Sequence, residues 1–412
     1  MRNSANPPSS IVLDAHADII GPAAEARRTL ILAGLAHALH DGYTDAIYVL
    51  LPIWRAEFGL DYVALALLRG LYAGAMAAFQ VPATRLADRL GGRCLLILGT
   101  LVAAAGYAGA GLTGGVVGLY AALVVSGIGS SVQHPIASGA VSRAYGEAAR
   151  GPLGTYNFSG DLGKAAIPAA LSFALSIAPW RPSLWLLSLA GVAVAMLLAA
   201  GLPRIAPAMG PERTVETPAG RARGGFLLLF AIGVLDTGVR MGLLTFLPFL
   251  LQMKGATQPI IGTAMALVFL GGAAGKFACG WLGQRWGVVG VVLCTEGATA
   301  LLIAATVVLP LAPLLAILPL LGVMLNGTSS VLYGAVPELT SFERTERAFA
   351  VFYTGVIGSG ALSPLLFGAL GDCAGPVTAT LATAIVALTT FPLAMRLGPK
   401  LAIPTNPAQP GG

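Results

Sequence analysis

The feature that most constrains this chain is a succession of apolar stretches, each long enough to form a membrane-spanning helix. A helix needs about 20 apolar residues to cross the hydrocarbon core of a bilayer. Such stretches begin near residues 29, 62, 94, 116, 152, 183, 225, 259, 288, 311, 347 and 375. The sequence therefore predicts an all-α membrane protein with about twelve transmembrane helices.

Charge is scarce and unevenly distributed. Only 10% of the residues are charged, against about 25% in soluble domains. Lys and Arg gather in alternate loops, and because basic loops resist translocation, both termini and the middle loop are predicted to be cytoplasmic. The net charge of +6 follows from this bias, so no nucleic-acid partner is expected. Abundant Arg, Ala and Gly indicate a bacterial gene and hence the bacterial cell inner membrane.

Polar segments divide the chain into two halves. We expect a disordered cytoplasmic tail over residues 1–28, a six-helix bundle over 29–202, a cytoplasmic linker over 203–224, a second six-helix bundle over 225–398, and a cytoplasmic tail over 399–412. The halves repeat each other, since Leu51 and Pro52 recur as Leu247 and Pro248. Internal repeats of this size are typical of secondary transporters, which bind substrate near the midplane between the halves.

Ionisable residues inside the apolar stretches are the main functional signal. Each costs about 2.5 to 3.5 kcal/mol on insertion scales, so each is a functional hypothesis by default. The set comprises Asp41, Asp45, Arg69, Asp161, Lys164, Asp236, Arg240, Lys276 and Glu296. Their charges nearly cancel, which favours ion pairs inside the bundle.

The first apolar stretch carries His37, Asp41 and Asp45 at intervals of four residues, which places them on one helix face. Two carboxylates in a low-dielectric cavity cannot both ionise cheaply, so at least one should hold a proton near neutral pH. We predict that these three residues couple transport to protons. The alternative is that they only hydrogen-bond neighbouring helices.

Two acid–base pairs follow from helical spacing. Asp161 can pair with Lys164, and Asp236 with Arg240, each pair on one helix face. They neutralise charge locally, or they act as gates that open on protonation. Glu296 lies early in the ninth stretch, and we expect it far from the cavity.

Other polar residues have no obvious local partner. Arg69 and Lys276 must reach acids in other helices, such as Asp41 or Asp45, or an anionic substrate. His134 precedes a proline that breaks the fourth stretch, which makes it a candidate for facing the substrate. Further candidates for the cavity are Tyr156, Asn157 and Tyr353.

A metal or an enzymatic activity has weaker support. His37, His40, Asp41 and His134 offer suitable donors, but no ligand-spacing motif supports a metal site, so a metal cargo is a minor alternative. The chain has no phosphate-binding loop and no hydrolase or metalloprotease motif. We therefore expect no enzyme and no cofactor, and an ion gradient as the energy source.

The loop after the second apolar stretch carries a family resemblance. Its residues Leu86, Ala87, Asp88, Arg89, Gly91 and Arg93 are similar to the signature of the major facilitator superfamily, with Thr84 in place of the usual leading Gly. A weaker copy consists of Gly280, Leu282, Gly283, Arg285 and Gly287, with Gln284 at the acidic position. The resemblance implies alternating access between two bundles, with Asp88, Arg89, Arg93 and Arg285 at a cytoplasmic gate.

Within that superfamily the chain resembles fosmidomycin-resistance-type exporters. The likeness rests on His37 with Asp41, on the stretch 127–135, and on glycines leading to Pro168, where Ile167 and Lys164 depart from the antiporter pattern. It implies a monomeric proton antiporter in the lipid bilayer that exports a drug or small metabolite. The alternatives are uptake of an organic acid by proton symport, metal export, and a non-transporting receptor with the same fold.

Overall fold

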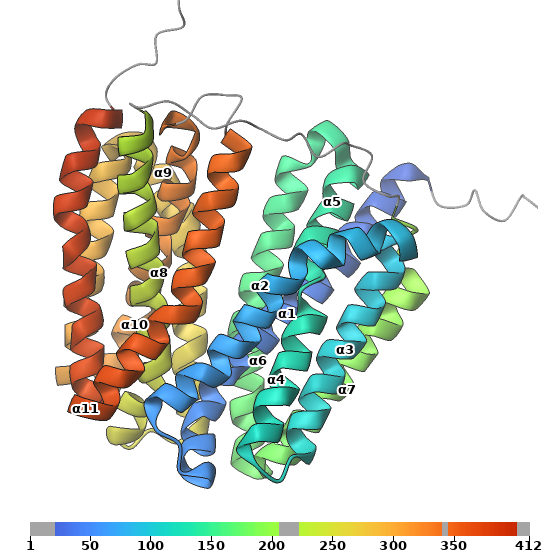
Figure 1. Cartoon of the computed structure of the whole chain (residues 1–412), viewed down its shortest axis with the longest axis horizontal. Coiled ribbons are helices and arrows are strands. Elements are labelled where there is room, and N and C mark those ends of the chain that lie inside the picture. The colour runs from blue at the N-terminus through green and yellow to red at the C-terminus, as the bar shows by residue number, and fades with distance from the viewer. Residues whose placement is uncertain (1–20, 206–221, 340–344, 402–412) are drawn as a thin grey trace, which may run out of the picture.

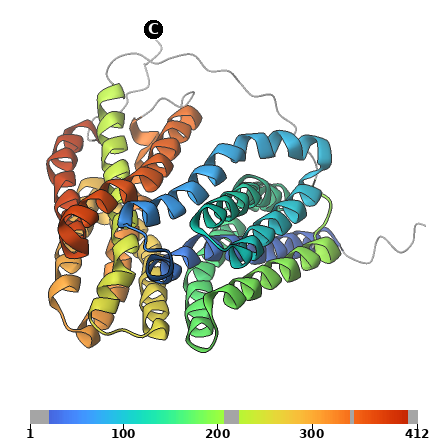
Figure 2. The same cartoon turned by 60° about the horizontal axis from the view of Figure 1, so that its bottom comes forward.

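The computed structural model describes residues 21–205, 222–339 and 345–401, and these residues form helices without any strand. Two helical bundles lie side by side, one built from the N-terminal half and one from the C-terminal half (Figures 1 and 2). The predicted all-α fold is confirmed.

The N-terminal bundle contains six membrane-length units. Its helices are α1 (Pro22–Phe58), α2 (Tyr62–Leu90), α3 (Gly92–Leu112), α4 (Val116–Ser130), α5 (Ser138–Tyr145), α6 (Arg150–Ile177) and α7 (Trp180–Gly201). A π-helical turn, Gln133–Ala137, joins α4 to α5, so these two helices act as one span.

The C-terminal bundle contains four continuous helical stretches, two of which turn back on themselves. They are α8 (Ala222–Met253), α9 (Gln258–Val308), α10 (Leu311–Ala335) and α11 (Thr345–Leu401). Gly287 breaks α9 with φ of 68°, and Gly375 breaks α11 with φ of 86°. Such positive φ values favour glycine, which has no Cβ to clash. Each of these two stretches is therefore a pair of helices joined by a tight turn.

Eight helices among the described residues are long and apolar enough to cross a membrane. Two of the eight are the paired helices α9 and α11, and α1 and α6 add two further spans that contain the buried charges. The described part of the chain thus has the predicted twelve spans. Their order and starting points follow the apolar stretches in the sequence closely.

The segment boundaries differ slightly from those expected. Helix α1 begins at Pro22 and not near residue 29, because the polar residues before the apolar stretch continue the helix from a proline at its first position. Helix α8 begins at Ala222 and α11 extends to Leu401. Most of the predicted tails and linker, residues 1–20, 206–221 and 402–412, lie outside the described residues.

Helices α1 and α6 touch through glycine, and this contact gives a first prediction. A Cβ at Gly163 would overlap the carbonyl oxygen of Ala38, so the two backbones approach closely there. We expect Gly163→Ala to destabilise the protein by about 2 kcal/mol, because the rigid backbones must separate. The melting temperature in detergent measures this. Gly154→Ala on the same helix meets open space and is the control; equal melting temperatures for the two variants would contradict the prediction.

Candidate functional site

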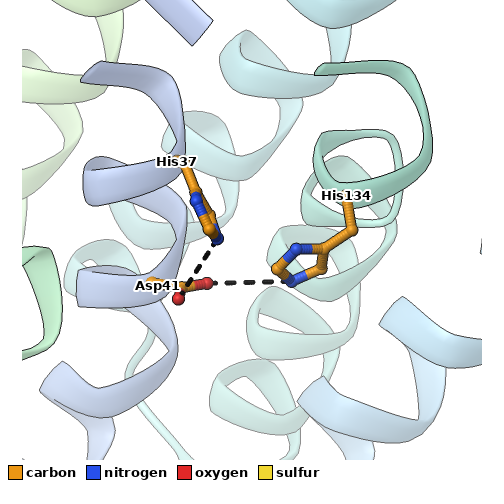
Figure 3. A group of neighbouring side chains, drawn as sticks. All are labelled: His37, Asp41 and His134. Carbon is orange, nitrogen blue, oxygen red and sulfur yellow. Dashed lines mark ion pairs between the residues drawn. The ribbon is translucent and has the colours of Figure 1, made fainter. Parts of the chain in front are cut away.

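Asp41 of α1 lies at the centre of a buried polar cluster. Its Oδ2 is 3.3 Å from Nε2 of His37 and 3.1 Å from Nζ of Lys164, and its Oδ1 is 3.7 Å from Nε2 of His134. Figure 3 shows both histidine rings turned toward this carboxylate. His37 and Asp41 are buried, whereas 43% of the His134 side chain is exposed. The structure thus joins four residues predicted from the sequence, His37, Asp41, His134 and Lys164, in one cluster.

An ion-pair chain extends from this cluster into the other half. Lys164 is 3.7 Å from Asp161, as the helical spacing predicts. Asp161 also accepts two hydrogen bonds, of 2.6 and 2.7 Å, from Nζ of Lys276 on α9. We call this series of ion pairs the central chain. It runs through the side chains of Asp41, Lys164, Asp161 and Lys276, so it alternates in charge and crosses from the N-terminal to the C-terminal bundle.

Asp45 lies one turn beyond Asp41 and has a different partner. Its carboxylate is 4.0 Å from Arg69 of α2, whose guanidinium lies 5.5 Å from the ring centre of Tyr48. Arg69 thus pairs with an acid of the first helix, one of the two partners expected from the sequence. Asp41 and Asp45 are both buried, but Asp41 alone belongs to the central chain.

A small cavity lies between the bundles beside the central chain. Its volume is about 120 Å³, and its wall combines apolar side chains with two acids and two bases. The lining residues are Asp45, Asp161, Lys164, Arg240, Met241, Leu244, Phe269, Gly272 and Asn326. Because both halves contribute charged groups, the cavity matches the midplane site of a transporter with two repeats.

The predicted pair between Asp236 and Arg240 is wrong. Arg240 donates to Asn326 of α10 at 3.2 Å and to Thr237 at 3.4 Å, and no ion pair joins it to Asp236 among the described residues. Asp236 instead lies beside Glu296, and both carboxyl groups are buried. Glu296 is not among the residues that line the cavity. Helical spacing permits a pair, but contacts between helices decide which pair forms.

The predicted aromatic and amide candidates have different environments. The carbonyl of Tyr156 accepts a hydrogen bond from Nδ1 of His37 at 2.8 Å, and the two rings stack with centres 4.2 Å apart. Asn157 is exposed, and its side chain makes no hydrogen bond to the described part of the chain. Tyr353 is 47% exposed and stacks on Tyr333 in the C-terminal bundle. Only Tyr156 therefore belongs to the buried cluster.

The predicted gate residues make no contact between the halves in the described structure. Asp88 and Arg89 are exposed and have no ion pair there. Arg93 donates to the carbonyl of Ala199 within its own half, and Arg285 lies over the ring of Trp281 in the other. The closed gate expected at this end is not formed in this conformation.

The two halves also meet at the opposite end, through a contact that no sequence pattern predicted. Asp372 of α11 accepts hydrogen bonds from the backbone N–H groups of Tyr62, at 2.7 Å, and Val63, at 3.0 Å. These groups begin α2, whose other end carries Asp88, and a carboxylate is favourable at a helix N-terminus. Nearby, Gln258 of α9 donates to the carbonyl of Val49 at 2.8 Å. Asp372 therefore fastens the end of the molecule remote from Asp88.

This contact gives a second prediction. Asp372→Ala removes two charge-assisted hydrogen bonds, so we expect the population open at that end to rise by about 10-fold. Spin labels at Val117→Cys and Val308→Cys, both on that end, report the change as a longer distance in a variant that lacks the native cysteines. An unchanged distance distribution would contradict the role of Asp372. Asp61, which caps α2 within one half, provides the control as Asp61→Asn.

Twelve helical spans in two bundles, with a charged cavity between them, define a polytopic membrane transporter. The family model described as Major Facilitator Superfamily matches residues 33–230 and again 226–411, so the chain belongs to that superfamily. The double match agrees with the internal repeat. No curated protein matches the sequence significantly.

Solved structures share the fold over nearly the whole chain. A bacterial homologue of the human lysosomal transporter Spinster, in an inward-facing conformation, has a TM-score of 0.76 at 17% identity and covers 92% of this chain and 98% of its own. The nucleoside transporter NupG has a TM-score of 0.74 at 12% identity, covering 90% and 99%. A POT family transporter in complex with 5-aminolevulinic acid has 0.72 at 14%, covering 91% and 97%. At these identities the likeness concerns the fold alone.

Proposed function

We propose that the chain is a proton-coupled antiporter that exports a small molecule by alternating access. The observation that supports this most strongly is the central chain, because it links Asp41, buried in one half, to Lys276 in the other. Secondary transporters need such a link, since binding of the coupling ion must change how the two halves contact each other.

The order of the pairs suggests how a proton could act. Lys164 is held by Asp41 at 3.1 Å and by Asp161 at 3.7 Å, while Lys276 is held by Asp161 alone. A proton on Asp41 removes the charge that holds Lys164, so Lys164 moves toward Asp161. There it competes with Lys276 for the same carboxylate, which weakens the bond between the halves. Protonation on one helix thereby loosens a contact between the bundles.

The conformation fits a cavity that opens toward the cytoplasm. Asp372 and Gln258 fasten the end remote from Asp88, and among the described residues the predicted gate residues make no contact between the halves. The distribution of basic loops favours an orientation in which the Asp88 end and both termini face the cytoplasm of a bacterial cell. We infer that this monomer is ready to take cargo from the cytoplasm, and the likeness to fosmidomycin-resistance-type exporters favours export of a drug or small metabolite.

A second candidate is uptake of a small organic acid together with protons. Lys164 and Arg240 both line the cavity, and either can bind a carboxylate. In this alternative the organic anion enters from the side of the membrane opposite the cytoplasm, and protons are transported in the same direction. The two functions differ in the direction of proton flow relative to cargo.

Purified protein in liposomes with an interior pH dye tests the proposal. Drugs, organic acids and metal salts are added outside one at a time, and the change in interior pH is recorded. Antiport predicts that a transported compound drives protons the opposite way. A compound that enters without any proton movement would contradict the coupling, and one that enters together with protons would establish the symporter.

A further inference from the structure

His37, Asp41 and His134 place two imidazoles and a carboxylate close together, beside Lys164, which lines the central cavity. One donor atom from each lies within 4.8 Å of the other two. We propose that these three residues form a binding site for a divalent transition-metal ion, which makes such an ion a cargo of the transporter. The proposal rests on the proposed function in one respect: the metal ion and the coupling protons bind to the same side-chain atoms of His37, Asp41 and His134.

The hydrogen bonding of His37 is the first argument. Its Nδ1 lies 2.8 Å from the carbonyl oxygen of Tyr156, which can only accept, so Nδ1 carries a hydrogen and donates. In the neutral ring, Nε2 then directs a lone pair at the Asp41 carboxylate 3.3 Å away. Two acceptors at that distance repel each other unless a cation lies between them. A proton on the ring, a proton on the carboxylate, or a metal ion satisfies this arrangement.

The same hydrogen bond is typical of metal-binding histidines. A ligating His usually donates its other ring N–H to a carbonyl or carboxylate, which fixes the ring and its tautomer. Tyr156 performs that function for His37, and the stacked Tyr156 ring holds the imidazole plane. The His37 ligand is therefore already oriented, without any movement of α1.

The geometry also accommodates one ion. Bonds of about 2.0 to 2.2 Å to nitrogen and oxygen place tetrahedral ligands roughly 3.3 to 3.6 Å apart. Nε2 of His37 is 3.3 Å from Oδ2 of Asp41, within this range, and Nε2 of His134 is 3.7 Å from the other oxygen, Oδ1. One donor atom from each of the three residues lies within 4.8 Å of the other two, so the ligands must draw together around an ion. The half-exposed His134 needs only a small rotation, and it stands on the π-helical turn Gln133–Ala137, a feature often found at functional sites. Three ligands leave a fourth position open for cargo to enter and leave.

The chemistry of the donors narrows the class of ion. Imidazole suits zinc, nickel, copper and iron, whereas magnesium and calcium prefer oxygen donors only. Two imidazoles and one carboxylate therefore select a transition metal over the abundant hard cations. Protons compete for all three groups, so metal binding must weaken as pH falls.

Lys164 supplies a test that a merely structural cluster would fail. Its Nζ lies 3.1 Å from Asp41 Oδ2, so it competes with a metal ion for that carboxylate, although Asp161 offers it a second partner. Removing this positive charge should strengthen metal binding by about 10-fold. A substitution that improves binding cannot be explained by damage to the fold.

Titration of the purified full chain with Co²⁺ in detergent, without a histidine tag, tests the site. Tetrahedral Co²⁺ absorbs visible light, so the spectrum reports both affinity and geometry. We expect saturable binding that Zn²⁺ displaces and Mg²⁺ does not, tighter at pH 8 than at pH 6. His134→Ala and Asp41→Asn should weaken it at least about 100-fold, since loss of an outer partner alone costs 10- to 100-fold. Lys164→Met should tighten it.

His40→Gln is the matched control, because His40 lies on α1 but bonds to Ser130 and Thr100 outside the cluster. Its affinity for Co²⁺ should equal that of the wild type. No absorption band, equal binding by the His134 and Asp41 variants, or weaker binding by Lys164→Met would each overturn the metal site. If the metal site is overturned in this way, proton antiport of an organic compound in liposomes would still support the proposed function. If Co²⁺ binds as expected but no compound drives proton movement in liposomes, the metal site stands and the proposed proton coupling is overturned.

Discussion

An Asp41→Asn variant is expected to lose proton-driven transport, down to the background rate of empty liposomes, while it still exchanges labelled for unlabelled organic cargo, which does not bind through the metal ligands. Asparagine is nearly the same size as aspartate and can still contact His37 and Lys164. It cannot take up or release a proton, so the step that moves Lys164 toward Asp161 no longer depends on pH. Cargo exchange requires only that the cargo-loaded transporter changes between its two conformations, and the substitution does not prevent that change.

The measurement compares net cargo flux under a pH gradient with cargo exchange at equal pH, in the same liposomes. His40→Gln is the control, since His40 is buried on the same helix but outside the central chain, and it should retain both activities. Net proton-driven flux through Asp41→Asn at the wild-type rate would remove Asp41 from the coupling. Asp45, paired with Arg69, would be the next acid to substitute.

A large effect on stability is also expected for Asp161→Asn. This change leaves Lys164 and Lys276 facing each other without the carboxylate that both contact. Breaking a fully buried pair costs about 3 to 5 kcal/mol; because the two lysine side chains are 30% and 38% exposed, we expect about 2 kcal/mol here. The melting temperature in detergent should fall accordingly.

A compensating substitution separates charge from packing. In the double variant Asp161→Asn with Lys276→Met, one acid and one base are removed together, and most of the lost stability should return. Lys276→Met alone leaves Asp161 with Lys164 and should cost less than Asp161→Asn. A double variant as unstable as Asp161→Asn would mean that the carboxylate acts through its shape and not its charge.

The fold could be predicted from the sequence because membrane helices are specified locally. Tyr62, Val116 and Leu311 begin helices at the positions where apolar stretches begin, since backbone groups in lipid must be satisfied within the helix itself. The start of α1 at Pro22 was missed because polar residues outside the bilayer can also be helical. Hydropathy gives no boundary at such a position.

The site could be predicted only in part, for a related reason. Which residues are buried and charged is visible in the sequence, and so is the i,i+3 pair of Asp161 with Lys164. Which residues meet across helices is not visible, because tertiary packing decides it. The bond from Lys276 to Asp161 and the contact of Asp236 with Glu296 depend on such packing.

The conformation lay beyond the sequence altogether. An alternating-access carrier has at least two conformations with different contacts between its halves. The signature around Asp88 predicts the closed form at one end, whereas the structure shows Asp372 fastening the other. One sequence encodes both conformations, so a motif that stabilises one of them does not predict which conformation a structure will have.

The most direct test of proton antiport is the direction of cargo movement under a pH gradient, with the membrane potential clamped at zero. Liposomes containing purified protein are preloaded with equal cargo inside and outside, and a pH step is applied. Antiport predicts that cargo flows against the proton gradient and accumulates on the acidic side, and that reversing the pH step reverses the flow. Accumulation on the alkaline side, or no response to pH, would contradict it.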